Sequence, residues 1–159
     1  MADGGSRVPS VWWAPGRIPA GITTSELACT LDVLPTFAHL AGAPLPSHTI
    51  DGIDIWPMLT TPGAKSPRDS FYFYDVQLQY RAEEGRPQPR NSMKAVRSGR
   101  WKLYLESLRP TSLYDLYSDV SETHDLRARN AAVVDRLVRM ATAFDTEINA
   151  HIRPLGRLP

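Results

Sequence analysis

The side chains of this sequence that could do acid–base or metal chemistry are few and scattered. The histidines are His39, His48, His124 and His151. No pair of them has the His-x-His or His-x-x-x-His spacing that would place two ligands on one metal ion. His48 is the best candidate because Asp51 and Asp54 follow it closely. One interpretation is therefore a hydrolytic site around these three residues, or a cation held by the two carboxylates. Turn formation at Asp51-Gly52 and an ordinary surface histidine explain the same residues without any chemistry.

A second candidate is a concentration of positive charge in the second half of the chain. It consists of Arg81, Arg86, Arg90, Lys94, Arg97, Arg100 and Lys102. Arginine and lysine bind sulfate or carboxylate groups through charge-assisted hydrogen bonds, so this segment could hold an anionic ligand. The alternative is a solvated strand face on which Glu83, Glu84 and Glu106 partly neutralise the charge.

The composition argues against several functional classes. The 159 residues include 18 Lys and Arg against 17 Asp and Glu, so the charge indicates neither a nucleic-acid surface nor a store of cations. Cys29 is the only cysteine, which leaves no intrachain disulfide and no multi-cysteine metal site. The apolar runs are too short to span a membrane, and the opening MADGGSRVP lacks the apolar core of a signal peptide. Neither Gly-x-Ser-x-Gly nor Ser-x-x-Lys occurs, and no glycine-rich phosphate loop is present.

The elements that position these residues differ between the two halves. The apolar run at residues 8–13 predicts a short strand that is buried on both faces, as in a parallel sheet. Apolar residues recur at helical spacing over residues 31–41. We expect Asp32 to cap this helix with its carboxylate and Gly42 to end it. Residues 43–69 contain five prolines and are expected to form an extended loop.

The second half predicts an antiparallel sheet followed by a helix. Residues 70–74 (SFYFY) are strongly β-prone, whereas the polar residues 75–92 are expected to form a long loop. Residues 93–106 predict a hairpin that turns at Ser98-Gly99, and residues 113–117 a further strand. The chain then ends in a predicted helix with one apolar stripe, formed by Val134, Leu137, Val138, Ala141, Phe144 and Ile148.

Several short motifs occur along the chain in order. They are Gly4-Gly5-x-Arg7-Val8-Pro9 with Trp13-x-Pro15-Gly16, Asp32-x-x-Pro35-Thr36 with Leu40-Ala41-Gly42, Asp51-Gly52-x-Asp54, AVRSGRWKL at residues 95–103, and Leu113-Tyr114-Asp115-Leu116. This order and spacing resemble the C-terminal portion of the formylglycine-dependent sulfatase family, which includes arylsulfatases and N-acetylgalactosamine-6-sulfatase. The resemblance implies an α/β fold, α+β within this chain. Residues 1–69 would be the end of an alkaline-phosphatase-like α/β domain, and residues 70–159 a small antiparallel sheet with a C-terminal helix.

The same resemblance implies a chemistry for the complete enzyme. A formylglycine hydrate, made from the Cys or Ser of a Cys/Ser-x-Pro-x-Arg motif, attacks the sulfur of a sulfate ester beside a calcium ion. In this chain Cys29 is followed by Leu31 and Val33 where that motif needs Pro and Arg, and no Asp-Asp or Asp-Asn pair is present to hold the metal. We therefore assign no catalytic residue, metal or cofactor to this chain, and we expect Ca²⁺ and formylglycine in the full-length enzyme. Family members are usually periplasmic, secreted or lysosomal, and the sequence leaves the compartment of this chain open.

These observations predict a C-terminal fragment of a sulfatase that is not catalytic alone. In the complete enzyme, which would hydrolyse aryl or carbohydrate sulfates, Arg81, Arg86 and Arg90 are expected to bind the substrate. The expected partner is thus a sulfated small molecule or sugar, with neither nucleic acid nor membrane. The isolated chain is expected to self-associate through the exposed edge of the strand at residues 8–13. The alternative is an autonomous, non-catalytic module that binds an anionic glycan or a protein partner through the basic loop.

Overall fold

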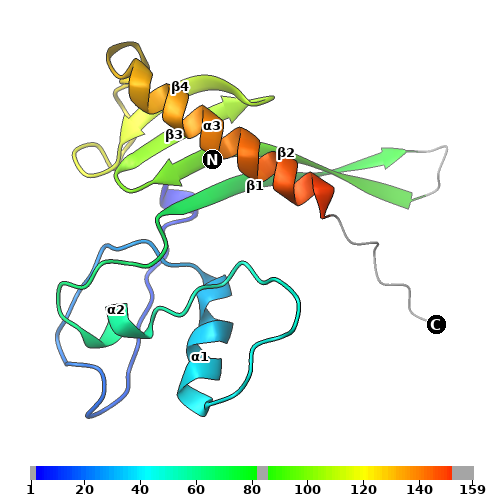
Figure 1. Ribbon diagram of the computed structural model, residues 1–159. Coiled ribbons are helices and arrows are strands. Elements are labelled where there is room, and N and C mark those ends of the chain that lie inside the picture. Colours follow the sequence, from blue (N-terminus) through cyan, green and yellow to red (C-terminus); the bar gives the residue numbers. More distant parts are fainter. Residues whose placement is uncertain (1–2, 82–85, 152–159) are drawn as a thin grey trace. The chain divides into compact units, whose positions relative to one another are not determined.

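Four strands, each paired with the next along the chain, form one sheet, and two compact units share the polypeptide (Figure 1). The computed structural model describes residues 3–81 and 86–151, with the side chains of residues 4–75 and 92–151. The helical unit is Val8–Ser70, and the sheet unit combines Met1–Arg7 with Phe71–Pro159. A short 3₁₀ turn, η1, occupies Asp3–Gly5.

The sheet consists of β1 (Ser70–Arg81), β2 (Arg86–Ser98), β3 (Trp101–Glu106) and β4 (Arg109–Asp115). Strands β2 and β3 are antiparallel with Ser98 opposite Trp101, and β3 and β4 are antiparallel with Trp101 opposite Asp115. The predicted hairpin at residues 93–106 is confirmed. Its tight turn includes Gly99 at φ +56°, a left-handed backbone conformation that glycine adopts without steric cost.

The long loop predicted at residues 75–92 is wrong. Strand β1 continues to Arg81 and β2 already begins at Arg86, so most of this polar segment forms paired strands. Figure 1 shows the two strands running on together beyond the rest of the sheet. Backbone pairing between neighbouring strands satisfies N–H and C=O groups whatever the side chains are. Polar composition alone therefore did not indicate a loop.

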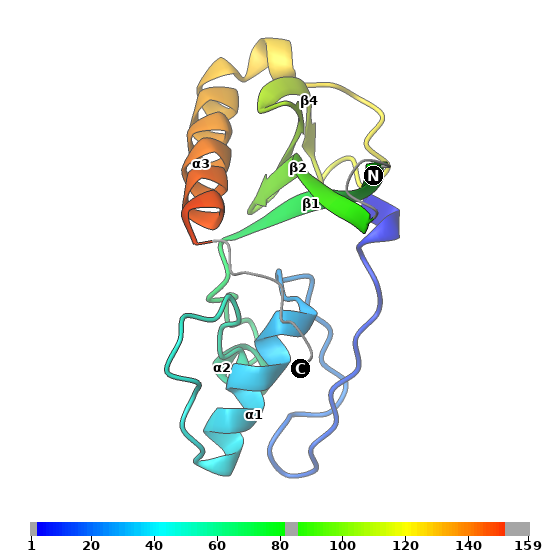
Figure 2. The same cartoon turned by 90° about the vertical axis from the view of Figure 1, so that its right-hand side faces the viewer.

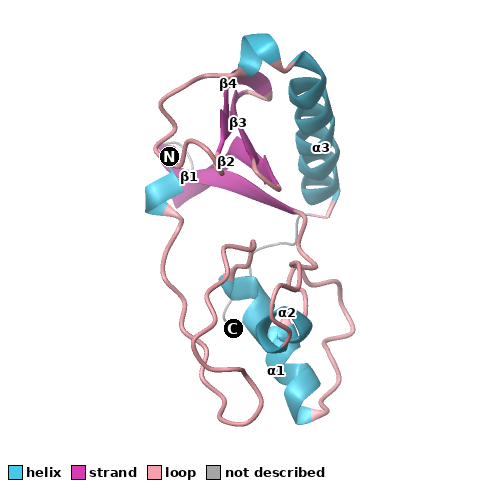
Figure 3. Ribbon diagram, turned by 90° about the vertical axis from the view of Figure 1, so that its left-hand side faces the viewer, coloured by secondary structure: helices cyan, strands magenta, loops and turns pink. Residues whose placement is uncertain are grey.

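Helix α3 (Ala131–Ala150) covers one face of the sheet (Figures 2 and 3). Val134, Leu137 and Ala141 are buried against a cluster from β2, β3 and β4 that includes Val96, Leu103 and Leu113. Phe144 stacks on Tyr72 of β1, with ring centroids 3.9 Å apart and planes 4° from parallel. The predicted apolar stripe is thus the side of α3 that completes the core.

The helical unit contains a 3₁₀ turn η2 (Thr30–Asp32), α1 (Val33–Ala41) and α2 (Trp56–Thr60). The predicted helix is confirmed as α1, and Gly42 at φ +62° ends it. The loop predicted for residues 43–69 is wrong where α2 forms. Pro57 lies in the first turn of α2, where a missing backbone N–H does not interrupt the helical hydrogen bonds.

The strand predicted at residues 8–13 is also wrong, since this segment is irregular. Val8 is 72%, Val11 92% and Trp13 84% exposed. A strand needs a neighbouring strand to pair its backbone groups, and the described residues of the helical unit form no strand. The β-prone side chains of residues 8–13 were therefore not sufficient for a strand.

Candidate functional site

A closed ion pair lies inside the sheet unit. The Nζ atom of Lys102, on β3, lies 3.0 Å from Oε1 of Glu122, and the two side chains are 0% and 6% exposed. The Tyr104 hydroxyl donates to the same carboxylate at 2.9 Å. The ammonium also lies 4.9 Å from the ring centroids of Phe73 and Tyr104. Both charges are therefore satisfied within the protein, and this lysine is not a solvent-facing ligand for an anion.

Glu122 reaches this position through a backbone conformation that most residues avoid. Its φ angle is +55°, in the left-handed region that side chains other than glycine, asparagine and aspartate rarely adopt. The hydrogen bonds and the ion pair of its carboxylate offset the cost of this conformation. The loop after β4 is thereby anchored to β3.

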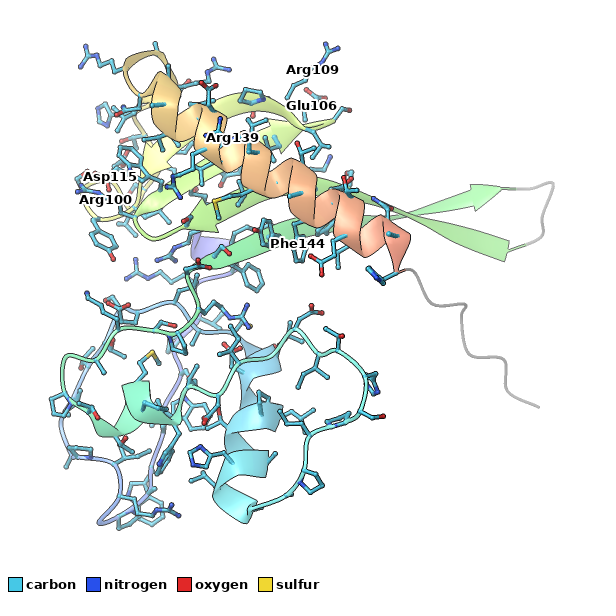
Figure 4. All side chains as sticks on the ribbon, viewed as in Figure 1. Arg100, Glu106, Arg109, Asp115, Arg139 and Phe144 are labelled. Atoms are coloured by element: carbon cyan, nitrogen blue, oxygen red, sulfur yellow. The ribbon has the colours of Figure 1, made fainter. Side chains whose placement is uncertain are left out.

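A second basic residue, Arg100, is also committed within the sheet unit (Figure 4). Its Nε donates to Oδ1 of Asp115 at 2.7 Å, and its Nη2 donates to Oδ2. The guanidinium lies over the rings of Trp101 and Tyr117, 5.7 and 5.6 Å from their centroids. The hydrogen bonds from Arg100, together with one from the Ser118 hydroxyl, lower the pKa of Asp115 to about 2. Arg100 therefore stabilises the turn that follows Asp115 at the end of β4.

The described residues of the predicted basic segment thus have different partners and do not form one anion-binding surface. Arg97 donates from Nε to the carbonyl of Gly99 at 3.3 Å, and Lys94 is half-buried on β2. The charges on Arg100 and Lys102 are neutralised by Asp115 and Glu122. From the sequence, we expected Glu83, Glu84 and Glu106 to neutralise this positive charge. Glu106 is exposed, and Glu83 and Glu84 lie outside the described residues.

The three arginines predicted to bind substrate fall where only the backbone is described. Arg81 ends β1, Arg86 begins β2, and Arg90 lies further along β2. Their side chains lie outside the described part of the chain, so their role stays a prediction. The structure does place the three residues on two neighbouring strands.

The helical unit is organised by Asp32, which is fully buried. Its carboxylate accepts hydrogen bonds from the N–H groups of Cys29 and Ile53, both at 2.9 Å, and from Nε and Nη2 of Arg68. Burial opposes ionisation of Asp32, but these hydrogen bonds outweigh it and lower the pKa of the carboxyl group. The same arginine donates to the carbonyl of Asp51 at 2.7 Å.

This corrects the predicted role of Asp32. It occupies the N-cap position of α1, yet its carboxylate makes no hydrogen bond that caps this helix; it accepts instead from the N–H of Cys29, the residue before η2. The side chain ties together η2, the segment at residues 51–53 and Arg68. A buried carboxylate next to a guanidinium is better satisfied by that partner than by helix N–H groups.

The predicted group of His48, Asp51 and Asp54 contributes one residue to a different pair. Oδ2 of Asp54 pairs with Nδ1 of His39, and its Oδ1 accepts from the N–H of Trp56 at 2.9 Å. Both oxygens are therefore engaged, and His48 is exposed. In the described part of the chain, no three His, Cys, Asp or Glu side chains are grouped so that they could hold a metal ion. These residues do not fit the calcium site that the sulfatase resemblance implies.

The other titratable groups have local roles. His151 interacts through Nδ1 with the carbonyl of Glu147 at 2.8 Å, and His124 lies on an exposed loop with its Nδ1 3.6 Å from Asp119. Burial raises the pKa of the Cys29 thiol, which disfavours the reactive thiolate. Cys29 therefore does not have the character of a nucleophile.

One open depression of about 450 Å³ lies at the turn between β3 and β4. Glu106, Ser107, Arg109 and Thr111 line it, and Glu106 and Arg109 face each other across the strand pair (Figure 4). The lining side chains are all exposed. Among the described helices, none is both long and apolar enough to cross a membrane.

Sequence reasoning missed the partners that make these charges structural. Lys102 and Arg68 were visible as basic residues, but Glu122 and Asp32 lie far from them in the sequence. The local pattern around Lys102 pointed the other way. The residue alternates with Trp101, Leu103 and Leu105, which predicts a solvent-facing side chain on the opposite face of the strand, whereas the side chain is fully buried.

Comparisons with known proteins give the family. The family model described as N-sulphoglucosamine sulphohydrolase, C-terminal, matches residues 1–144. Human arylsulfatase A is 37% identical over 146 residues, which cover 78% of this chain and 27% of the human protein. Canine N-acetylgalactosamine-6-sulfatase is 40% identical over 72 residues, which cover 45% of this chain and 14% of that protein.

A solved structure agrees with these relatives. The crystal structure of Ps i-CgsB superposes with a TM-score of 0.65 at 28% identity, and the match covers 82% of this chain and 27% of Ps i-CgsB. Its complex with k-i-k-neocarrahexaose gives a TM-score of 0.63. The chain thus spans about a quarter of the length of the first relatives that it matches. Its sheet, C-terminal helix and neighbours confirm the predicted fold class, and the chain belongs to the sulfatase family as a C-terminal portion of it.

Proposed function

We propose that this chain acts as the C-terminal portion of a sulfate-ester hydrolase and does not hydrolyse sulfate esters by itself. The observation that carries the proposal is the match of residues 1–144 to the C-terminal part of the family. The matched relatives are an arylsulfatase and an N-acetylgalactosamine-6-sulfatase by name. Substrates of the complete protein would accordingly be aryl or carbohydrate sulfates. Ca²⁺ and formylglycine would be supplied by the remainder of the enzyme.

The contacts of the chain support a scaffolding role for its buried charges. Asp32 with Arg68, and Lys102 with Glu122, are enclosed pairs that link separate segments of their units. A substrate sulfate would have to displace a buried carboxylate to reach either cation, at the cost of leaving that carboxylate unpaired. These cations therefore position the backbone, and other residues would meet the substrate.

The proposed contact with substrate is the ribbon formed by β1 and β2. Arg81, Arg86 and Arg90 lie on its two strands, and arginine suits sulfate because its N–H groups form charge-assisted, bidentate hydrogen bonds. Ps i-CgsB, a structural neighbour at 28% identity, has been crystallised with k-i-k-neocarrahexaose. In this chain the three arginines would hold a sulfated sugar next to a site supplied by the rest of the enzyme.

A segment swap tests this function. The part of human arylsulfatase A that this chain matches is replaced by the chain itself, and hydrolysis of an aryl sulfate is measured. We expect the chimera to be active, whereas the isolated chain and an arylsulfatase A lacking the segment are not. A folded but inactive chimera would overturn the proposal, and salt-sensitive binding of the isolated chain to a sulfated glycan would then favour an autonomous module. Turnover by the isolated chain, lost in His48→Ala, would overturn it in favour of a self-standing hydrolase.

A further inference from the structure

The outer edge of β4 is closed by the chain itself. A strand at the border of a sheet presents N–H and C=O groups that can pair with another chain. On β4, the N–H of Leu113 donates to Oδ1 of Asp125 at 2.9 Å, and its C=O accepts from the N–H of Leu126 at 2.8 Å. The C=O of Pro110 accepts from Nη1 of Arg127 at 2.8 Å. These bonds leave little of the edge for another strand.

The first part of β2 is protected in a different way. Strand β3 pairs with residues 95–98 of β2, so the earlier residues of β2 have a second edge beyond their pairing with β1. Pro87 and Pro89 lie in this part. Backbone groups two residues apart face the same side of an antiparallel strand. Because β2 is hydrogen-bonded to β1, the two missing N–H groups belong to the outer edge, where proline prevents the addition of a strand.

Strand β1 has neither kind of protection in its sequence. It is the other border strand of the sheet, with β2 as its neighbour among the described strands. Its twelve residues, Ser70–Arg81, include no proline and no lysine, the two residue types that most often block an edge. Figure 1 shows β1 continuing with β2 beyond the rest of the sheet. This outer part of β1 is therefore the edge that is best suited to accept another strand.

The sequence of this outer part is complementary to itself. Residues 75–81 read Asp-Val-Gln-Leu-Gln-Tyr-Arg, so apolar and polar residues alternate between the two faces of the strand. If two copies pair antiparallel about a two-fold axis at Leu78, every residue lies opposite one of matching character. The opposed residues are Asp75 with Arg81, Val76 with Tyr80, and Gln77 with Gln79. A register shifted by one residue would set apolar residues against polar ones.

We infer that the outer edge of β1 binds the same edge of a second copy of this chain, so that the two sheets join into one across a two-fold axis. Such an interface uses the same residues on both copies, as the commonest protein dimers do. Backbone hydrogen bonds would supply the pairing, and the opposite charges at the two ends would set its direction and register. The inference goes beyond the proposed function and does not depend on sulfate-ester hydrolysis.

The first test measures dimerisation of the full chain by sedimentation equilibrium. The parent chain should form dimers. Leu78→Lys sets two lysines opposite each other at the axis and should raise the dimer dissociation constant about tenfold or more. Thr111→Lys is the matched control, because Thr111 is an exposed residue of β4, whose edge is closed, and it should dimerise like the parent. Circular dichroism of the diluted variants checks that each chain is folded.

The second test exchanges the charges at the two ends of the segment. Asp75→Arg and Arg81→Asp should each weaken the dimer about fivefold or more, because like charges then lie opposite each other. The double variant should restore dimerisation. Within one chain the two residues are six positions apart, roughly 20 Å along a strand, so they cannot contact each other there. Restoration therefore requires two copies.

Three outcomes would overturn the inference. A parent chain that sediments as a monomer has no such interface. Dimers that Leu78→Lys leaves intact form through a different surface. A double charge variant that dimerises no better than the single variants excludes the antiparallel pairing about Leu78. If Leu78→Lys does not fold, the charge exchange decides the question alone, and none of these results alters the outcome of the segment swap.

Discussion

Nζ of Lys102 lies 3.0 Å from Oε1 of Glu122, and the pair joins β3 to the loop after β4 beside the rings of Phe73 and Tyr104. The ammonium group is fully buried. Removal of either partner leaves an uncompensated charge in a place that water does not reach, which costs far more than the loss of a surface pair.

Lys102→Met is therefore expected to lower the free energy of unfolding by about 3–5 kcal/mol. The matched control is Lys65→Met, which removes a lysine that is 82% exposed and 2.9 Å from Glu26, and it should cost less than about 1 kcal/mol. Urea unfolding of the chain, followed by circular dichroism, measures both. The double variant Lys102→Met with Glu122→Leu should cost less than the sum of the single changes. Equal costs for the two lysine variants would contradict the structural role of the buried pair.

Gly52→Ala is expected to disrupt the Asp32 centre. A Cβ atom at this position would overlap the backbone carbonyl of Leu31 and touch the Pro35 ring, so the segment that carries Ile53 must move. Such overpacking costs about 1–3 kcal/mol. The sensitive measurement is hydrogen exchange at the Ile53 amide, which donates to Asp32 and should exchange faster. Gly5→Ala is the control, since a Cβ atom there meets nothing within 4 Å, and slow exchange in both variants would contradict the prediction.

Acid should weaken the sheet unit through Asp115. Hydrogen bonds from Arg100 lower the folded-state pKa from 3.8 to about 2. A depressed carboxyl pKa adds stability that is complete above the unfolded pKa and is lost as the pH falls through the folded one. Stability should thus decline between pH 3.8 and about 2, and Asp115→Asn should flatten this part of the curve.

Arg100→Gln should flatten the same part of the curve, because it removes the largest cause of the shift. Arg129→Gln, at an exposed arginine of η3 (Arg127–Arg129), should leave the decline intact. Thermal melts across this pH range provide the measurement. If the stability of Asp115→Asn falls with pH as steeply as that of the parent chain, other carboxylates cause the loss and the prediction is wrong.

Charge reversal at Arg81, Arg86 and Arg90 tests the proposed substrate contact. In an active chimera, the triple change to Glu should raise KM for a sulfated sugar about tenfold or more, since a charge-assisted hydrogen bond contributes about 1.5–3 kcal/mol. The control reverses Arg127, Arg129 and Arg139, three exposed arginines of η3 and α3, and changes the net charge equally. If both triple variants have the KM of the parent chimera, the three arginines do not hold the substrate.

Local signals were sufficient for some elements of the fold. The apolar spacing of α1 and the glycine that ends it, and the Ser98-Gly99 turn between β2 and β3, depend on neighbouring residues alone. The apolar stripe of α3 likewise identified the side that packs on the sheet. The predictions for residues 8–13 and 75–92 were wrong because they relied on composition, β-prone in the first segment and polar in the second. A strand also requires a neighbouring strand that pairs its backbone groups, and composition does not show whether that neighbour is present.

The charged residues show the same limit at the level of side chains. A basic segment was visible from Arg81 to Lys102, but its division depends on Asp115 and Glu122, which only the folded chain brings close. Similarly, Asp32 was predicted as a helix cap, although Arg68 and the N–H of Ile53 claim its carboxylate. An aspartate before an apolar helical pattern predicts an N-cap. The sequence does not show which distant donors will hydrogen-bond to its carboxylate instead.

The sheet unit is discontinuous in the sequence, because residues 3–7 precede the helical unit along the chain and Phe71 onward follow it. During synthesis, residues 3–7 leave the ribosome before the helical unit. They cannot pack within their own unit until the strands and α3 have also been synthesised. The helical unit is contiguous and can join Arg68 to Asp32 as soon as its own last residues emerge. Translation that stops within the strands would therefore release a chain whose helical unit is complete while its sheet unit has no helix to cover it.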